Sequence, residues 1–231
     1  MNFNEIKQIS ISEWEAKKNS SKIIIYIGLA TCGKSAGAED VANEIHARLS
    51  KEKIEYEIVQ VGCIGLCYLE PLVDIVKPDT PRITFGKVTI KNVAKIINYI
   101  LYDKIPKELV INLYEIPFMK HQVRRILKRC GFVDPENINH YIANEGYAGL
   151  NKALKMSPEE IIEEIKASGL RGRGGAGFPT WKKWELCRQT KNVVAQFIEP
   201  DKSGNYKYII CNADEGDPGA FMNRALLESD P

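Results

Sequence analysis

The sequence predicts an α/β protein, and three observations lead to that prediction. Runs rich in β-branched and aromatic residues alternate with stretches of helical apolar spacing over the first hundred residues. A capped helix, a glycine-rich loop and a second helical stretch follow between residues 157 and 189. A final apolar run at 206–211 stops at a group of polar residues that begins with Asn212. Together these patterns indicate an N-terminal α/β domain and the first part of a second one.

Length and composition limit the class of protein. At 231 residues the chain suits two small domains, each with a buried core. Its 44% hydrophobic and 27% charged residues are typical of a globular protein, which excludes disordered and collagen-like chains. A net charge of +2 is too small to indicate that the chain as a whole binds nucleic acid. Without a long apolar run or a signal core, we expect a cytoplasmic protein with no membrane contact of its own.

The first domain, residues 1–102, contains five predicted elements. In chain order they are a strand at 22–30, a helix at 38–52, a strand at 53–61, a strand at 71–76 and a helix at 93–103. The order β-α-β-β-α resembles that of a thioredoxin-like module of roughly 100 residues. We therefore expect this fold for the first domain.

Residues 103–157 are predicted to form a connector and a helical lead-in. Two prolines and mixed periodicity mark residues 103–122 as the connector. The basic run at 120–129 has an apolar face, which favours a surface helix over a nucleic-acid contact. Residues 134–154 have helical spacing. The second domain then covers residues 158–231.

The glycine-rich loop lies between two predicted helices. Ser157 is the N-cap of the first helix, Pro158 occupies its first position, Glu160 completes a capping box, and Gly169 ends it. The loop therefore follows a helix, whereas the glycines of a phosphate loop or a dinucleotide fingerprint follow a strand. Both of those motifs are excluded.

The loop and the polar residues after the last apolar run have complementary chemistry. Glycines at 172, 174, 175 and 177 let backbone N–H groups approach a ligand, and Arg173 and Lys183 add positive charge. Asn212, Asp214 and Glu215 offer acceptors to sugar hydroxyls or ring N–H groups. A phosphorylated planar ligand such as flavin mononucleotide (FMN) suits this lining. The alternatives are a flexible surface loop and an RNA-binding arginine-glycine box, although such boxes normally recur.

Two long motifs carry a family resemblance. "GLRGRGGAGFPTWKKW" at 169–184 and "NADEGDPGAFMNR" at 212–224 closely resemble the flavin- and NADH-binding subunit of respiratory complex I and its soluble relatives in NAD-linked hydrogenases and formate dehydrogenases. The resemblance runs from about Glu115 to the C-terminus. Residues 22–102 are similar to the thioredoxin-like N-terminal extension of those relatives.

The resemblance implies an electron-input subunit that transfers hydride between NAD(P)H and FMN and passes electrons to iron-sulfur clusters. Its partners would be a 2Fe-2S thioredoxin-like subunit and a larger iron-sulfur or catalytic subunit. The residues that would line the flavin are Gly172, Arg173, Gly174, Gly175, Lys183, Asn212, Asp214 and Glu215. Phe178 would stack on the nicotinamide dinucleotide, and Asp217 would face its ribose. Lys183 would act catalytically, by stabilising negative charge on the reduced ring.

The sequence also departs from the family pattern. Trp181 stands where many relatives have a small residue, and Asn223 replaces a frequent aspartate. A four-cysteine 4Fe-4S module is expected only beyond Pro231, so we expect these 231 residues alone to bind FMN weakly. The alternative function is a non-enzymatic assembly or docking module with an incomplete flavin site.

Three cysteines of the first domain are predicted to converge at strand ends: Cys32, Cys63 and Cys67. A 2Fe-2S cluster takes four protein ligands. In relatives that bind one here, the first ligand lies five residues before the second, where this sequence has Ile27. We therefore predict that the domain holds no cluster, serves as a docking scaffold and keeps three free thiols.

The remaining candidates have structural interpretations. Six cysteines without a secretory signal indicate thiols or metal ligands rather than disulfides. Cys130, Cys187 and Cys211 occur singly, so we expect them to pack in a core. Trp184 is likewise expected in a core. The three histidines have no partner at metal-ligand spacing and are given no role.

Overall fold

The computed structural model describes residues 1–113, 115–189 and 210–230. The chain divides into two compact units, which are considered separately. Unit 1 comprises residues 1–146 and 213–231, and unit 2 comprises residues 147–212. The predicted domain boundaries at 102 and 157 stay predictions.

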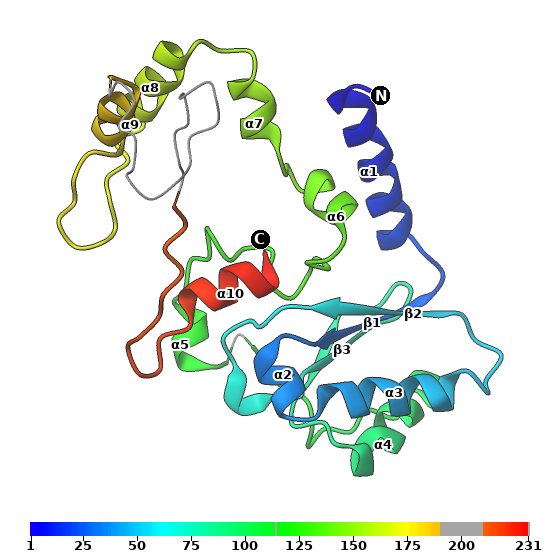
Figure 1. Ribbon diagram of the computed structural model, residues 1–231. Helices are drawn as coiled ribbons and strands as arrows, with labels where there is room; N and C mark the ends of the chain where they lie inside the picture. Colours follow the sequence, from blue (N-terminus) through cyan, green and yellow to red (C-terminus); the bar gives the residue numbers. More distant parts are fainter. Residues whose placement is uncertain (114, 190–209, 231) are drawn as a thin grey trace, which may run out of the picture. The chain divides into compact units, whose positions relative to one another are not determined.

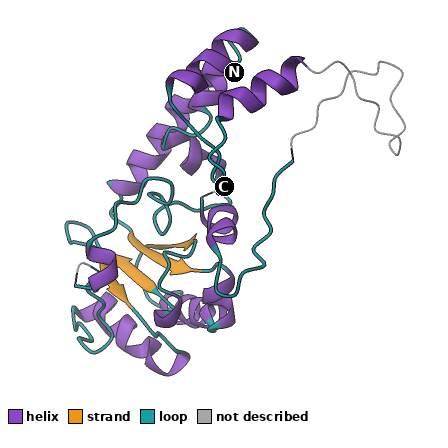
Figure 2. Cartoon of the chain, turned by 90° about the vertical axis from the view of Figure 1, so that its left-hand side faces the viewer, coloured by secondary structure: helices purple, strands orange, loops and turns teal. Residues whose placement is uncertain are grey.

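A four-stranded mixed sheet forms the centre of unit 1 (Figure 2). The strands are β1 (Ile23–Gly28), β2 (Tyr56–Val61), β3 (Val73–Val76) and β4 (Ile83–Phe85), in the spatial order β2-β1-β3-β4. β1 runs parallel to β2 and antiparallel to β3, and β3 runs antiparallel to β4. The three longer strands match the predicted runs. β4 is three residues long, too short to show a clear pattern in the sequence.

Two helices cover one face of this sheet (Figure 1). α3 (Ala38–Leu49) connects β1 to the parallel strand β2, and α4 (Ile90–Tyr102) follows β4. This arrangement is thioredoxin-like, and the predicted order β-α-β-β-α is confirmed with β4 added. The α/β fold class is therefore correct.

The main core lies between the sheet and these two helices. β1 contributes Ile25 and Ile27, which alternate with residues that face the other side. α3 buries residues at helical spacing, Val41, Ile45 and Leu49. α4 does the same with Val93, Ile96, Ile97 and Ile100. Because the same residues that set the sequence periodicity form the core, the pattern and the packing agree.

The opposite face of the sheet carries a smaller apolar cluster of Ile24, Val59 and Val61. Above this face, α1 (Phe3–Lys18) packs on α6 (Ile138–Ala143). Trp14 of α1 meets the buried His140 ring edge-on, with ring centroids 4.8 Å apart. α1 starts with a capping box of Asn2 and Glu5 that the sequence analysis missed.

Arg82 joins β3 to the segment that follows the connector. Its guanidinium lies 4.3 Å from the Tyr26 ring centroid and 4.7 Å from that of Phe132. It also pairs with Asp74 and donates to the Gly131 carbonyl. This paired and stacked charge fixes residues 131–132 against the sheet.

Residues 120–129 do not form the surface helix that the sequence analysis predicted. The short helix α5 (Pro117–Lys120) ends where the basic run begins, and the run itself is made of turns and loops. Val123 and Ile126 are exposed. An apolar face that finds no partner supplies little free energy to hold a helix, so periodicity alone was insufficient here.

Unit 2 is helical over its described residues. Its elements are α7 (Ala148–Ala153), α8 (Pro158–Ala167) and α9 (Thr180–Gln189), with α8 packed on α9. The predicted capping box of Ser157 and Glu160 is confirmed. The helical stretch predicted at 134–154 is divided into α6 and α7, because Glu145 and Tyr147 between them have positive φ values.

Three residues of unit 2 that were predicted to pack in a core are exposed. Trp184 is 47% exposed, and Cys187 and Cys211 are also exposed, whereas Cys130 of unit 1 is buried as predicted. The main helix contact of α9 within the described residues is with α8, and much of the surface of α9 is exposed.

Throughout the described ranges, no helix has both the length and the apolar character that a bilayer span requires.

Candidate cofactor and metal sites

The glycine-rich loop of unit 2 is a closed loop between α8 and α9. Its two ends form an antiparallel bridge between Arg171 and Pro179. The Gly172 N–H donates to the Phe178 carbonyl at 2.8 Å, and the Arg171 Nε donates to the Gly177 carbonyl at 2.6 Å. These hydrogen bonds hold the two ends of the loop together at its base.

Two glycines in the loop are required by the backbone. Gly175 has φ 101° and Gly177 has φ 61°, a region that L side chains rarely adopt. A Cβ at Gly174 or Gly175 would meet no atom of the described residues within 4 Å. This is the geometry expected of a loop that receives a ligand on its backbone.

Lys183 lies at the base of the loop. A Cβ at Gly172 would stand 3.5 Å from the Lys183 Nζ and 3.4 Å from the Phe178 carbonyl oxygen. The ammonium group of Lys183, on α9, is therefore close to the loop backbone, and its predicted flavin role stays a prediction. Arg173 and Phe178 are exposed on the same loop.

Trp181, the residue that departs from the family pattern, packs away from the loop tip. Its ring lies 5.2 Å from the Lys166 Nζ and 5.3 Å from the Lys182 Nζ. Lys166 belongs to α8, so Trp181 joins α8 to α9 through cation–π contacts. The residue holds the two helices together on either side of the loop.

The segment that begins at residue 210 is not a strand where the structure describes it. The predicted strand ran over 206–211, but residues 206–209 lie outside the described residues and residues 210–216 have no regular structure. The predicted turn at Asp217 is confirmed, because the Ala220 N–H donates to the Asp217 carbonyl at 3.0 Å and Gly219 has φ 80°. No neighbouring strand pairs with the described part of this segment.

Glu215 caps a helix in this structure. Its carboxylate accepts the N–H groups of Asn223 at 2.6 Å and Arg224 at 3.0 Å, at the start of α10 (Met222–Ser229). Asn223 also donates its side-chain amide to the Asp214 carbonyl at 3.4 Å. The segment 214–224 is therefore folded back on itself.

The predicted flavin residues fall into two groups that belong to different units. Gly172, Arg173, Gly174, Gly175, Phe178, Lys183 and Asn212 belong to unit 2, and Asp214, Glu215 and Asp217 belong to unit 1. Each group is described separately. The flavin roles of both groups stay predictions.

The structure brings the three cysteines of the first domain together, as predicted. The Sγ atoms of Cys32, Cys63 and Cys67 all lie within 4.8 Å of one another. The Sγ atoms of Cys63 and Cys67 are 3.6 Å apart, and the Gly65 N–H donates to Cys63 Sγ at 3.3 Å. Cys32 comes from α2 (Thr31–Ser35), and Cys67 begins the 3-10 helix η1 (Cys67–Leu69). Burial raises the pKa of all three thiols.

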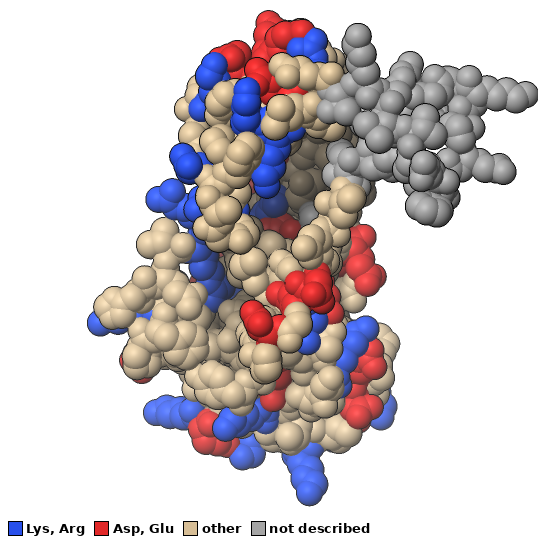
Figure 3. All heavy atoms as spheres, turned by 60° about the vertical axis from the view of Figure 1, so that its left-hand side comes forward, with Lys and Arg blue, Asp and Glu red and all other residues tan. Residues whose placement is uncertain are grey.

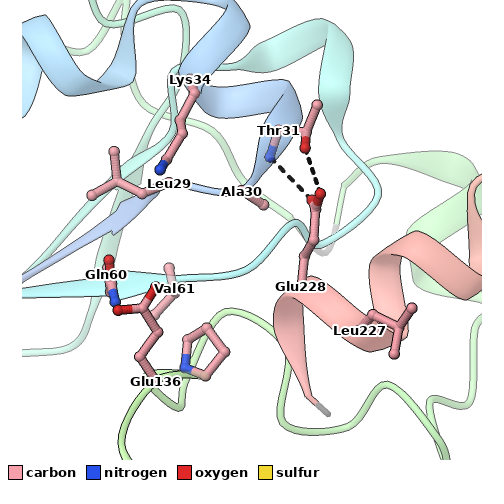
Figure 4. Close-up of a pocket in the computed structure, with 10 residues that line it drawn as sticks. Leu29, Ala30, Thr31, Lys34, Gln60, Val61, Glu136, Leu227 and Glu228 are labelled. Atoms are coloured by element: carbon pink, nitrogen blue, oxygen red, sulfur yellow. Dashed lines mark hydrogen bonds between the residues drawn. The ribbon is translucent and has the colours of Figure 1, made fainter.

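Two side chains of α10 contact α2, the helix that carries Cys32. The Glu228 carboxylate accepts the Thr31 N–H at 3.0 Å and also the Thr31 hydroxyl, which satisfies the start of α2 (Figure 4). Arg224, one turn earlier in α10, donates to Cys32 Sγ at 3.4 Å. Neither contact can be recognised from the sequence, because each joins residues almost 200 positions apart.

A buried carboxyl group lies near the cluster. Glu70 is 8% exposed and accepts the Leu72 N–H at 2.8 Å, and burial raises its pKa to about 7. A Cβ at Gly28 would stand 3.0 Å from both Glu70 carboxylate oxygens, whereas one at Gly33 would clash with the Gly28 carbonyl oxygen at 1.9 Å. Gly28 thus leaves room for Glu70 at the end of β1.

An apolar pocket of about 400 Å³ adjoins the cluster in unit 1. Its lining includes Cys63 and Gly65, Met119 of α5, and Phe221 and Met222 at the start of α10.

On the face shown in Figure 3, basic and acidic side chains both occur, so neither sign dominates that face.

Fold and sites together define a class: a thioredoxin-like module with a cysteine cluster, joined to a glycine-rich loop suited to a phosphorylated cofactor. Residues 165–231 match the family described as the Nuo51 FMN-binding domain. Over these residues the chain is similar to the FMN-binding domain of the complex I 51 kDa subunit.

Among curated proteins, the chain is 51% identical over 112 residues to the NADP-reducing hydrogenase subunit HndC of Solidesulfovibrio fructosivorans, covering 48% of this chain and 20% of HndC. It is 35% identical over 180 residues to the NAD-reducing hydrogenase HoxS subunit alpha of Cupriavidus necator, covering 76% of this chain and 26% of that protein. The chain therefore spans about a fifth to a quarter of the length of these relatives.

Among solved structures, the thioredoxin-like [2Fe-2S] ferredoxin from Aquifex aeolicus aligns with 40% of this chain and 99% of its own. The TM-score is 0.36 and the sequence identity is 16%.

Proposed function

We propose that this chain is part of an electron-input subunit, which exchanges hydride between NAD(P)H and FMN and passes electrons to iron-sulfur clusters of a multi-subunit complex. The main support for this proposal is the hydrogen-bonded glycine loop with the Lys183 Nζ at its base, within a segment that matches an FMN-binding family. The names of HndC and HoxS subunit alpha, both subunits of hydrogenases that reduce NADP or NAD, support the same role.

The residues of the loop fit an anionic planar ligand. The open loop tip at Gly174 and Gly175 lets a ring or a phosphate approach the backbone directly. Arg173 and Lys183 supply the positive charge that such a ligand requires. Bound FMN would supply hydride acceptance and the release of single electrons.

Lys183 is proposed to act by charge. Its ammonium would stabilise negative charge that develops on a ligand held against the loop, and no proton transfer by the protein is required. Phe178 would offer its exposed ring for stacking with the nicotinamide dinucleotide. Asp214 and Asp217 would bind polar groups of the ligands, and Glu215 would hold the segment through its cap on α10.

The test uses the full-length protein that contains these residues. Lys183→Ala should slow NADH-driven dye reduction by about 10²-fold, the cost of removing a donor that stabilises transition-state charge. Lys182→Ala is the matched control, since its side chain pairs with Glu185 and lies over Trp181. Equal rates for Lys183→Ala and the unmutated protein would remove Lys183 from the site.

Flavin content separates this function from its alternative. A yellow full-length protein with stoichiometric FMN supports electron input. A protein that binds no flavin would favour the non-enzymatic docking module. A cytoplasmic location, NADH as the donor and the identities of the partner subunits stay predictions.

A further inference from the structure

The cysteine cluster does not fit the 2Fe-2S cluster that the family resemblance implies. Such a cluster takes four protein ligands, two for each iron. In the described part of the chain, the group of converging cysteines offers three thiols, Cys32, Cys63 and Cys67. The fourth position implied by the resemblance holds Ile27, which is fully buried in the core beneath α3 and α4. No iron-sulfur step is therefore assigned to this domain.

The spacing of the three thiols suits one metal ion. Tetrahedral zinc with Zn–S bonds of about 2.3 Å places two bound sulfurs about 3.8 Å apart. The Sγ atoms of Cys63 and Cys67 are already 3.6 Å apart, and Cys32 Sγ lies within 4.8 Å of both. Small side-chain rotations would bring all three sulfurs onto a single ion.

We propose that Cys32, Cys63 and Cys67 bind a single thiophilic metal ion, with Zn²⁺ as its representative. Three thiolates select soft or borderline ions such as Zn²⁺ over Mg²⁺ or Ca²⁺. The fourth coordination position is left to solvent, as in zinc sites with three protein ligands. The observations that support this metal site do not depend on the proposed flavin site.

The surroundings of the cluster support a charged metal-thiolate group. Three thiolates and one divalent cation leave a net negative charge, which the Arg224 guanidinium, 3.4 Å from Cys32 Sγ, offsets. The Gly65 N–H at 3.3 Å from Cys63 Sγ stabilises the sulfur in its thiolate form. Glu228 keeps α10 against α2, so that Arg224 stays beside Cys32.

Zinc binding is measured first on the full chain. The exposed Cys187 and Cys211 are replaced by serine to remove unrelated thiols, and the protein is reduced, loaded with Zn²⁺ without oxygen and dialysed. We expect one zinc per chain. Substitution with Co²⁺ should give a sulfur-to-cobalt charge-transfer band, which reports thiolate ligation directly.

Variants then locate the site. Cys32→Ser or Cys67→Ser, each at a half-buried position, should lower zinc affinity by about tenfold or more, because each removes one of the three thiolate ligands. Arg224→Met should also weaken binding about tenfold, with recovery in Arg224→Lys. Cys130→Ser is the matched control, because Cys130 is a free thiol outside the cluster, and it should keep one zinc per chain.

Two results would overturn the proposal. One is a chain that, after reconstitution with iron and sulfide, holds two irons and two acid-labile sulfides, which would show a complete cluster with a further ligand. The other is a folded chain, by its circular dichroism, that keeps no zinc after dialysis and shows three free thiols at the cluster.

Discussion

Unit 1 and unit 2 differ in how much of their structure is buried. In unit 1 the sheet and two helices enclose a continuous core, in which Ile25, Ile27 and Phe85 are fully buried. In the described part of unit 2, Ile162 is the one buried side chain. Helical stability in proteins comes mainly from such packing. Unit 1 therefore has its own stabilising core, whereas the described part of unit 2 is held mainly by helix capping and by the packing of α8 on α9.

The largest expected effect follows from the core of unit 1. Ile27→Ala removes a fully buried side chain from between the sheet and its helices, and should lower the free energy of unfolding by about 2–5 kcal/mol. Denaturant unfolding measures it. The control is Ile126→Ala, a residue that is 73% exposed, with an expected change within about 0.5 kcal/mol. Equal losses in both variants would show that the core of unit 1 does not set its stability.

The buried Glu70 gives unit 1 a pH dependence. Its carboxyl ionises near 4.5 ordinarily and near pH 7 in the folded chain because of burial. Between these pH values the folded chain holds more protons than the unfolded chain, so the free energy of unfolding falls as pH rises, by roughly 3 kcal/mol in total. Glu70→Gln should remove this slope between pH 5 and 8.

The exposed Glu52→Gln serves as the control for that experiment, because its side chain lies at the surface. Unfolding curves of the three proteins at several pH values provide the measurement. A slope that persists in Glu70→Gln would assign the pH dependence to another group.

The smallest effect is expected in unit 2. Ser157→Ala removes the hydroxyl that accepts the Glu160 N–H at 3.2 Å, and should destabilise α8 by about 1 kcal/mol. Amide hydrogen exchange should speed up in α8 while the unfolding midpoint of unit 1 stays unchanged. Ser50→Ala, whose hydroxyl donates to a carbonyl at the end of α3, is the control. A shifted midpoint in Ser157→Ala would show that the two units unfold together.

The sequence determined the features whose physical cause is local. Helical spacing at Val41, Ile45 and Leu49, alternation in β1, and the capping box at Ser157 each act within a few residues, so they could be identified without a structure. The convergence of Cys32 with Cys63 and Cys67 followed from the fold, since strand ends of one sheet lie together. The glycine loop and Lys183 were also singled out from the sequence, and their flavin roles stay predictions.

Tertiary structure decided what depends on contacts between distant residues. Trp184 and Cys187 have side chains that are often buried in cores, yet both are exposed. The reason is that α9, within the described residues, packs mainly on α8. The basic run at 120–129 has helical spacing, yet Val123 and Ile126 of its apolar face are exposed. Arg224 at Cys32 and Glu228 at Thr31 join segments almost 200 residues apart, and no local pattern encodes a contact of that range. Such contacts depend on where whole elements pack, which is settled by the burial of many side chains at once.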